Sequence, residues 1–267
     1  MTNFFSRLFG KFANTAFWPP IQLFINKLYV KIFNINLSEF SPISSYKTLN
    51  ELFTRKLVIM RDFDTSKDVI ISPCDALITE LGSIKDNLAL QIKNKPYEIP
   101  DLLGEELEFL GFFYINLYLS PRDYHRFHAP CDMEILQVKY FSGALLPVNE
   151  PSLNKNDNLF IRNERVVVKA RVDGKIMYFV AVGALNVGKI HLNFDPNIQT
   201  NMKNVKDNKT YFYKDIFIKK GEELGRFEMG STIVLIAQNM MPIIDLKECA
   251  NKVKFAQAIA KFEANNG

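Results

Sequence analysis

The sequence predicts an α+β fold that is mostly β, with N-terminal amphipathic helices followed by an antiparallel β sandwich or barrel-like body. Hydrophobic residues make up 48% of the 267 residues, which is enough to bury a core and excludes a disordered chain. Beyond the N-terminal part, short β-branched and aromatic runs follow one another between Gly, Pro, Asn and Asp. No long helical patterns alternate with these runs, which argues against a doubly wound sheet.

Residues 1–45 carry the helical pattern. Apolar residues recur there at helical spacing with basic residues between them: Phe4, Phe5, Leu8, Phe9 and Phe12. The longest uncharged stretch, 12–26, is too short to span a bilayer and is interrupted by Pro19 and Pro20. We therefore expect a membrane-associating segment that lies in an anionic surface. A pair of helices packed on the protein's own core is the alternative.

The remaining residues, 46–267, are expected to form a β-rich catalytic domain that starts with a short helix near 47–57. The expected strands cover residues 68–73, 76–82, 88–92, 112–120, 133–143, 165–172, 175–185, 189–194 and 231–237. The polar stretch 193–209, rich in Asn and Lys, is expected to be an exposed loop.

Charge and cysteine content limit the classes of protein. The net charge of +4 is too small to indicate nucleic-acid binding. Cys74, Cys131 and Cys249 are an odd set without framework spacing, and no signal peptide with a cleavage site is recognisable. We therefore expect reduced thiols in a cytoplasmic environment.

Two of the three histidines lie in the stretch "LSPRDYHRFHAPCD". Ser120, the proline after it and Asp123 match a helix start, with the serine as N-cap and the carboxylate at the third position. The sequence therefore predicts a short helical turn that ends at Pro130 and places His125 and His128 on one side. The two imidazoles would then face the same space.

A carboxylate and a serine accompany these histidines. Asp75, in "ISPCDALI", lies in a corner between two strand-like runs and has no adjacent lysine or arginine. Ser231, in "FEMGSTIVLI", stands between two strand-like halves and directly before an apolar run that should be buried. Asp, His and Ser together form a set that can activate a nucleophile, because the carboxylate orients the imidazole that takes the hydroxyl proton.

Several interpretations of this set compete. A serine hydrolase is one, although the G-x-S-x-G pattern is absent and a nucleophile would not be expected at a buried strand. A zinc site formed by Cys74, His125, His128 and Cys131 is another, although their spacing fits no common zinc signature. Glycine before the serine permits a third: the hydroxyl, activated by His128 and Asp75, attacks the Gly230 carbonyl and cuts the chain. A hydrogen-bonded structural role is the simplest interpretation of any single histidine.

A series of motifs, in order along the chain from about residue 45, resembles the phosphatidylserine decarboxylase proenzymes. These motifs are "SPCDALITELG", "QIKNKPYEI", "YHRFHAP", "SGALLPVNE", "NERVVV", "VGALNVG" and "KGEELGRFEMGST". Two positions differ from the usual family pattern: Ala76 stands where glycine is usual, and Met229 stands where leucine is common. Neither change removes a reactive group, so we expect at most an altered rate of processing.

The resemblance implies a pyruvoyl-dependent lyase that is made as a zymogen. Autocatalytic cleavage between Gly230 and Ser231 would give a β chain, 1–230, and an α chain, 231–267, with Ser231 converted to the covalent pyruvoyl cofactor. Asp75 and His128 match the self-processing pair, and His125 matches the histidine that handles or protonates the substrate. Phosphatidylserine would be converted to phosphatidylethanolamine and CO2 through a Schiff base to the pyruvoyl group, without a metal.

The resemblance also gives the N-terminal segment a purpose, because the substrate's acyl chains stay in the bilayer. It implies a peripheral protein of phospholipid biosynthesis on the cytoplasmic face of the cell membrane, with phosphatidylserine and an anionic membrane surface as partners. The sequence does not fix the oligomeric state, and a homodimer stays open. A Ser-His-Asp lipid hydrolase without self-cleavage, a pyruvoyl enzyme for a soluble amino acid and a non-catalytic membrane-surface binding module are the alternatives.

Overall fold

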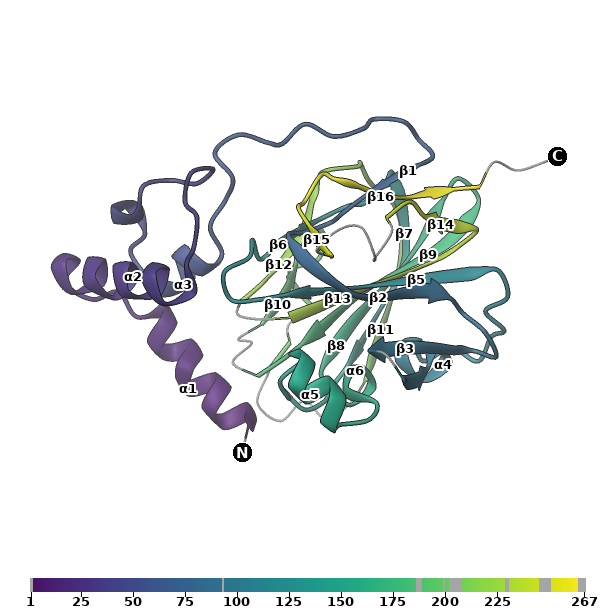
Figure 1. Ribbon diagram of the computed structural model, residues 1–267, viewed down its shortest axis with the longest axis horizontal. Helices are drawn as coiled ribbons and strands as arrows, with labels where there is room; N and C mark the ends of the chain where they lie inside the picture. Colours follow the sequence, from purple (N-terminus) through teal and green to yellow (C-terminus); the bar gives the residue numbers. More distant parts are fainter. Residues whose placement is uncertain are drawn as a thin grey trace.

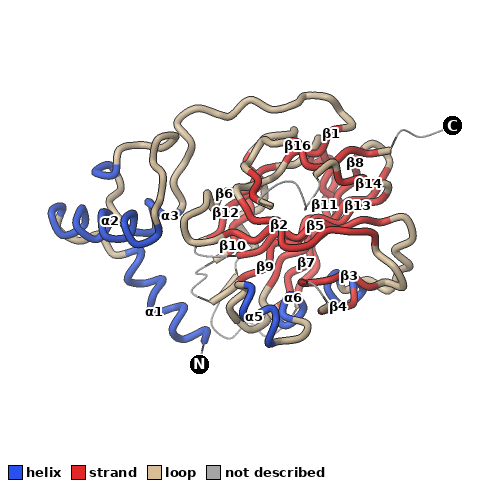
Figure 2. Tube along the Cα trace, viewed as in Figure 1, coloured by secondary structure: helices blue, strands red, loops and turns tan. Residues whose placement is uncertain are grey.

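The computed structural model describes residues 2–92, 94–185, 189–198, 200–201, 208–228, 231–244 and 251–263. It confirms a mostly β protein in which N-terminal helices precede an antiparallel body (Figures 1 and 2). An eight-stranded sheet has the order β11-β7-β8-β9-β13-β5-β2-β15. Its strands are β11 Lys209–Ile218, β7 Met133–Phe141, β8 Arg165–Val172, β9 Lys175–Gly183, β13 Ser231–Gln238, β5 Phe112–Leu119, β2 Ala76–Ser83 and β15 Lys252–Val253.

Three smaller sheets complete the β body. The first has the order β1-β16-β14, with β1 Val69–Ile71, β16 Ala258–Phe262 and β14 Met240–Pro242. The second has the order β10-β12-β6, with β10 Ile190–Leu192, β12 Glu223–Phe227 and β6 Arg126–His128. The third pairs β3 Leu88–Ile92 with β4 Lys95–Glu98. All pairs between these strands are antiparallel. Each of the nine expected strands is present, whereas β4, β6, β11, β12, β14, β15 and β16 were not expected.

The eight-stranded sheet has a core on each face because successive side chains of a strand point to opposite sides. On one face Leu117, Ile233 and Leu235 pack with Phe127 and other residues of the β10-β12-β6 sheet. The opposite face is covered by three short helices, α4 Ile99–Leu103, α5 Glu150–Lys155 and α6 Leu159–Arg162. The central strand β13 lies between β9 and β5, and its residues from Ser231 to Ala237 are buried. The unbroken apolar run of β13 is explained by this burial.

The N-terminal helices form a cluster beside the β body (Figure 1). They are α1 Thr2–Asn14, α2 Pro19–Phe33 and α3 Leu49–Phe53, with a one-turn helix at Ile43–Ser45. The two prolines start α2, as their fixed backbone angles favour at a first turn. The expected helix near 47–57 is present as the shorter α3, whose N-cap Thr48 accepts a hydrogen bond from the Glu51 amide at 3.0 Å.

The helical cluster has its own small core and an exposed apolar side. Tyr29, Leu52 and Phe53 are among its buried residues. Four large apolar residues of α2 are exposed to solvent at intervals of three or four: Ile21, Phe24, Leu28 and Ile32. Among the described residues, no helix is both long enough and apolar enough to cross a bilayer.

Two expectations lie partly outside the described residues. The polar stretch 193–209 is described except for residues 199 and 202–207. Its described part includes Thr200, which is buried and accepts a hydrogen bond from the Ile190 amide at 2.7 Å, so this stretch is not exposed throughout. Cys74 and Cys131 are buried free thiols, whereas Cys249 lies outside the described residues.

Candidate active site

Ser231 and the loop that leads to the two histidines lie at one end of strands β5 and β13. Ser231, the first residue of β13, pairs with Leu119 of β5 and with Gly183 of β9. The chain leaves β5 directly after Leu119 and reaches His125 six residues later. Phe227, which lies four residues before Ser231, donates a hydrogen bond from its amide to the His125 carbonyl at 2.9 Å. The topology therefore brings the serine and the histidine loop together.

Ser231 is fully buried at this strand end. Its Oγ has no hydrogen-bond partner among the described residues, and neither has Oγ1 of the neighbouring Thr232. A buried hydroxyl without a partner costs free energy, so such a group in a native protein calls for an explanation. Gly230, the other half of the expected cleavage site, and Met229 lie outside the described residues.

The stretch after β5 forms a tight turn and not the expected helical turn. The Asp123 carboxylate accepts hydrogen bonds from the Ser120 amide at 2.7 Å and from the Ser120 hydroxyl at 2.6 Å. The chain then becomes extended, and Arg126–His128 pairs with β12 as strand β6. The prediction of a helical turn was wrong because this strand pairing determines the conformation after Asp123. The two histidines consequently have different surroundings.

His125 is fully buried, and its ring packs on Phe53 of α3 with 3.9 Å between centroids. Its Nδ1 lies 2.8 Å from the Asp123 carbonyl, so Nδ1 carries the proton and donates it there. Burial lowers the pKa of His125 from its ordinary value of 6.5 to about 3, and the positive charge of Arg55 also contributes. The imidazole is therefore neutral, and its Nε2 is a buried acceptor without a partner among the described residues.

His128, the last residue of β6, is also buried. Its Nδ1 lies 2.8 Å from the Gly221 carbonyl and its Nε2 lies 3.0 Å from the Tyr124 hydroxyl, so Nδ1 donates and Nε2 accepts. The ring stacks on Phe255, with 3.8 Å between centroids. Burial lowers the pKa of His128, and the imidazole is neutral like that of His125. Unlike His125, His128 has a partner at each ring nitrogen.

Asp75 is held by an arginine that is distant in the sequence. Arg61 contacts its two carboxylate oxygens at 2.5 and 3.1 Å. The other side of the same guanidinium binds Glu39 at 2.7 and 2.9 Å. The Phe255 amide donates a further hydrogen bond to Asp75 Oδ1 at 2.8 Å. The absence of an adjacent basic residue in the sequence was therefore misleading, because the partner is Arg61.

Asp75 and His128 are linked indirectly by these contacts. Phe255 donates its amide to Asp75 and stacks its ring on His128. No hydrogen bond joins the Asp75 carboxylate to the imidazole in the described part of the chain, where Asp75 binds Arg61 and the amide while His128 binds Tyr124 and Gly221. The carboxylate thus fixes the residue that packs on the imidazole.

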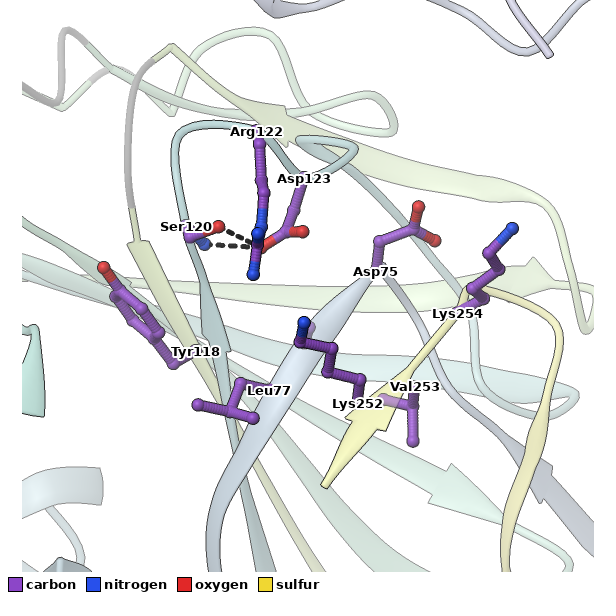
Figure 3. A pocket seen from close by; sticks show the side chains of 10 residues that line it. Asp75, Leu77, Tyr118, Ser120, Arg122, Asp123, Lys252, Val253 and Lys254 are labelled. Carbon is purple, nitrogen blue, oxygen red and sulfur yellow. Dashed lines mark hydrogen bonds between the residues drawn. The ribbon is translucent and has the colours of Figure 1, made fainter. Parts of the chain in front are cut away.

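Two pockets flank the turn that follows β5. A polar pocket of about 360 Å³ is lined by Asp75, Tyr118, Ser120, Arg122, Asp123, Lys252 and their neighbours, and Figure 3 shows these side chains. An apolar groove of about 420 Å³ is lined by residues of α1, α2 and α3 and by Pro121. Phe53, which packs on His125, forms part of the groove wall. The polar pocket and the apolar groove are thus separated by the turn that leads to His125.

Sequence reasoning missed Arg61, Tyr124, Phe255 and Lys252. Arg61 and Phe255 are 14 and 180 residues from Asp75 along the chain, so no local spacing connects them. The described residues contain no group of three or more His, Cys, Asp or Glu side chains placed to hold a metal ion.

The sequence is similar to one family of known proteins over most of its length. The family model described as phosphatidylserine decarboxylase matches residues 49–261. The chain is 55% identical to the phosphatidylserine decarboxylase proenzyme of Helicobacter pylori strain 26695, with 99% of each chain covered. It is 47% identical to the proenzyme of Campylobacter jejuni, over 96% of this chain and 97% of the relative. A protein of the same name from Plasmodium falciparum is 32% identical, over 88% of this chain and 69% of the relative.

Proposed function

This chain belongs to the phosphatidylserine decarboxylase family, and we propose that it converts phosphatidylserine to phosphatidylethanolamine and CO2 with a pyruvoyl group made from its own Ser231. The group would arise by self-cleavage between Gly230 and Ser231. The cut would give a β chain, 1–230, and an α chain, 231–267. The name proenzyme, carried by the relatives, agrees with a precursor that is processed.

The observation that carries the proposal is the buried hydroxyl of Ser231 at the start of a central strand, which has no hydrogen-bond partner among the described residues. A structural serine at a strand end would be expected to bind a backbone group or water. A hydroxyl without a hydrogen-bond partner among the described residues is instead available to add to the carbonyl before it. Elimination and hydrolysis would then consume one water, release one ammonia and leave Gly230 with a carboxylate.

We assign the self-processing step to Asp75 and His128. The neutral His128 has an acceptor at Nε2, which a hydroxyl proton can occupy, and that atom now binds Tyr124. His128 must therefore exchange the Tyr124 hydroxyl for that of Ser231. The contact of Phe255 with both Asp75 and His128 explains how loss of the carboxylate would displace the imidazole. Asp75 then acts by holding Phe255, which positions the imidazole of His128, and through its own negative charge.

His125 is the residue that we assign to proton delivery during decarboxylation. Decarboxylation replaces CO2 by a proton at the same carbon, so a proton carrier must lie close to residue 231. The buried Nε2 of His125 has no other partner among the described residues, so it could take up a proton released by the substrate's ammonium group and then pass it to that carbon. Phe53 and the bond to the Asp123 carbonyl fix the ring in place.

The residues around Ser231 fit a small covalent carbonyl group. The orphaned polar atoms of Thr232 and His125 supply hydrogen-bonding groups without other partners among the described residues. A pyruvoyl group supplies an electron sink that stabilises the negative charge left when CO2 departs.

We place the protein on the cytoplasmic face of the cell membrane as a peripheral protein, with residues 1–45 as the membrane-associating segment and 46–267 as the catalytic domain. Exposed Phe24 and Ile32 of α2 supply apolar surface of the kind that enters a bilayer interface. The apolar groove runs from these helices to Phe53 beside His125, so it offers the acyl chains a path from the bilayer.

The intact mass of the protein expressed in cells tests the proposal. Self-cleavage would produce two fragments, of which the smaller has 37 residues (267 − 230), or roughly 4 kDa. This fragment should be lighter by one ammonia than the same peptide starting with serine, and should lack a free amine. The variant Ser231→Ala should remain a single chain without decarboxylase activity. A folded, active and uncut wild-type chain would exclude the pyruvoyl mechanism.

The same experiment separates the alternative functions. A Ser-His-Asp lipid hydrolase would remain uncut and would lose activity with serine-directed inhibitors. A membrane-binding module would keep its function in the Ser231→Ala variant.

A further inference from the structure

The polar pocket beside the turn contains two cations without carboxylate partners. Arg122 and Lys252 line the pocket of about 360 Å³, and both are exposed (Figure 3). The guanidinium of Arg122 and the ammonium of Lys252 form no ion pair within the described ranges. Asp123, the carboxyl nearest to Arg122 in sequence, binds Ser120 instead. Asp75, which is paired with Arg61, and Asp123, which interacts with Arg122 through charge alone, also line the pocket. Among the described residues, the pocket therefore presents two cations that no ion pair neutralises.

The sheet register connects this pocket to the cleavage site. Lys252 of β15 pairs with Leu77 of β2, Leu77 pairs with Tyr118 of β5, and Tyr118 pairs with Thr232 of β13. Directly opposed residues share a face of the sheet, so this row leads from Lys252 to Thr232, next to the expected new chain end, whereas the Ser231 side chain points to the opposite face. Three strand spacings correspond to about 14 Å between the first and last Cα atoms. A lysine side chain and a small polar headgroup together span such a distance.

The chemistry of the reaction indicates which anionic group these cations bind. The serine headgroup carries a carboxylate, which leaves as CO2, and a phosphodiester, which keeps its charge throughout. A cation that bound the carboxylate would stabilise the ground state and lose its partner as CO2 departs, which slows the reaction. A cation on the phosphodiester stabilises substrate and transition state alike. An arginine also matches phosphate geometry through its planar fork of donors.

We propose that Arg122 and Lys252 form the subsite for the phosphodiester anion of the lipid headgroup. This inference depends on the proposed function, because it places the headgroup amine at residue 231. Arg122 precedes the expected cut and Lys252 follows it, so the β chain and the α chain each contribute one cation. The turn between the polar pocket and the apolar groove would then lie where the headgroup meets the acyl chains.

The test uses the double variant Arg122→Gln/Lys252→Gln and the matched control Lys214→Gln, which removes a charge from exposed β11 away from the pocket. The substrate is a short-chain, water-soluble phosphatidylserine, so that membrane binding does not contribute. Rates are expressed per mole of cleaved chain, which separates processing from turnover. The expected result is a KM about tenfold higher in the double variant, with kcat lowered less than threefold. The control should keep both wild-type constants.

Inhibition by glycerophosphoethanolamine identifies the anionic group, because this molecule has the phosphodiester but no carboxylate. Its inhibition constant should rise in parallel with KM in the double variant. An unchanged inhibition constant with a raised KM would show that the cations bind the carboxylate, which overturns the proposal. An unchanged KM would exclude the subsite altogether. Failure of the wild-type enzyme to decarboxylate the substrate would instead refute the proposed function.

Discussion

Acidification should destabilise this protein through His125 in particular. The folded protein keeps this buried imidazole neutral, with a pKa of about 3 against an ordinary 6.5. The unfolded chain therefore takes up a proton below pH 6.5 that the folded protein does not bind. Stability rises with pH wherever the unfolded state binds more protons, so it must fall as the pH is lowered from 6.5 towards 3. His128, whose pKa is also lowered by burial, contributes with the same sign.

The size of the effect follows from the two pKa values. Each pH unit within the interval costs about 1.4 kcal/mol for one proton. From pH 7 to pH 5 the contribution of His125 is about 2 kcal/mol, once partial protonation near pH 6.5 is included. This is a large fraction of the roughly 5–15 kcal/mol that stabilises a typical domain.

Urea unfolding at pH 7 and pH 5 measures this contribution. The Ser231→Ala background keeps the protein as one uncut chain, and His125→Asn is added to it. The parent should lose about 2 kcal/mol more than the His125→Asn variant between the two pH values. Because the loss between pH 7 and pH 5 is compared in the two proteins, any effect of the substitution on the free energy of unfolding that does not depend on pH cancels. Equal losses in the two proteins would show that His125 is not held neutral by burial, and the role assigned to its free Nε2 would fall with it.

Three further predictions concern other parts of the structure. Arg61→Ala leaves two partly buried carboxylates without their shared partner, so urea unfolding should show a loss of about 3 kcal/mol, and gel electrophoresis should show slower chain cleavage. Gly225→Ala would place a Cβ atom 2.0 Å from the His191 carbonyl oxygen, so thermal melting should detect severe destabilisation, whereas a wild-type melting temperature would contradict the contact. Phe24→Glu puts a charge on the exposed side of α2 and should weaken binding to anionic vesicles about tenfold in a sedimentation assay; unchanged binding would mean that this side does not enter the membrane.

The sequence predicted the parts of the fold that have a strong local pattern. Strands such as β5 and β13 were recognisable because they are buried runs of β-branched and aromatic residues bounded by turn residues. The two-residue strand β15 and the three-residue strand β6 have too few residues to show any period. Their conformation depends on pairing with β2 and β12, which are distant in the sequence.

The candidate residues of the site were chosen from the sequence, whereas their contacts could not be predicted from it. Asp75, His125, His128 and Ser231 are residue types with few other uses in this combination, so they could be selected from the sequence. The turn at Ser120 was misread because a serine and a carboxylate three residues apart make similar hydrogen bonds in a helix start and in an isolated turn. The pairing of β6 with β12 is what favours the isolated turn over a helix start.

The position of β13 would explain how the protein tolerates the proposed cut beside the candidate active site. If the chain is cleaved after Gly230, β13 becomes the start of the α chain but stays between β9 and β5, paired with both over seven or eight residues. The same fragment supplies β15 and β16, which pair with β2 and β1 of the other chain. Its Phe255 remains bound to Asp75 and stacked on His128. Because these contacts come from tertiary pairing and not from the severed peptide bond, the new chain end is fixed in the site where Ser231 stood.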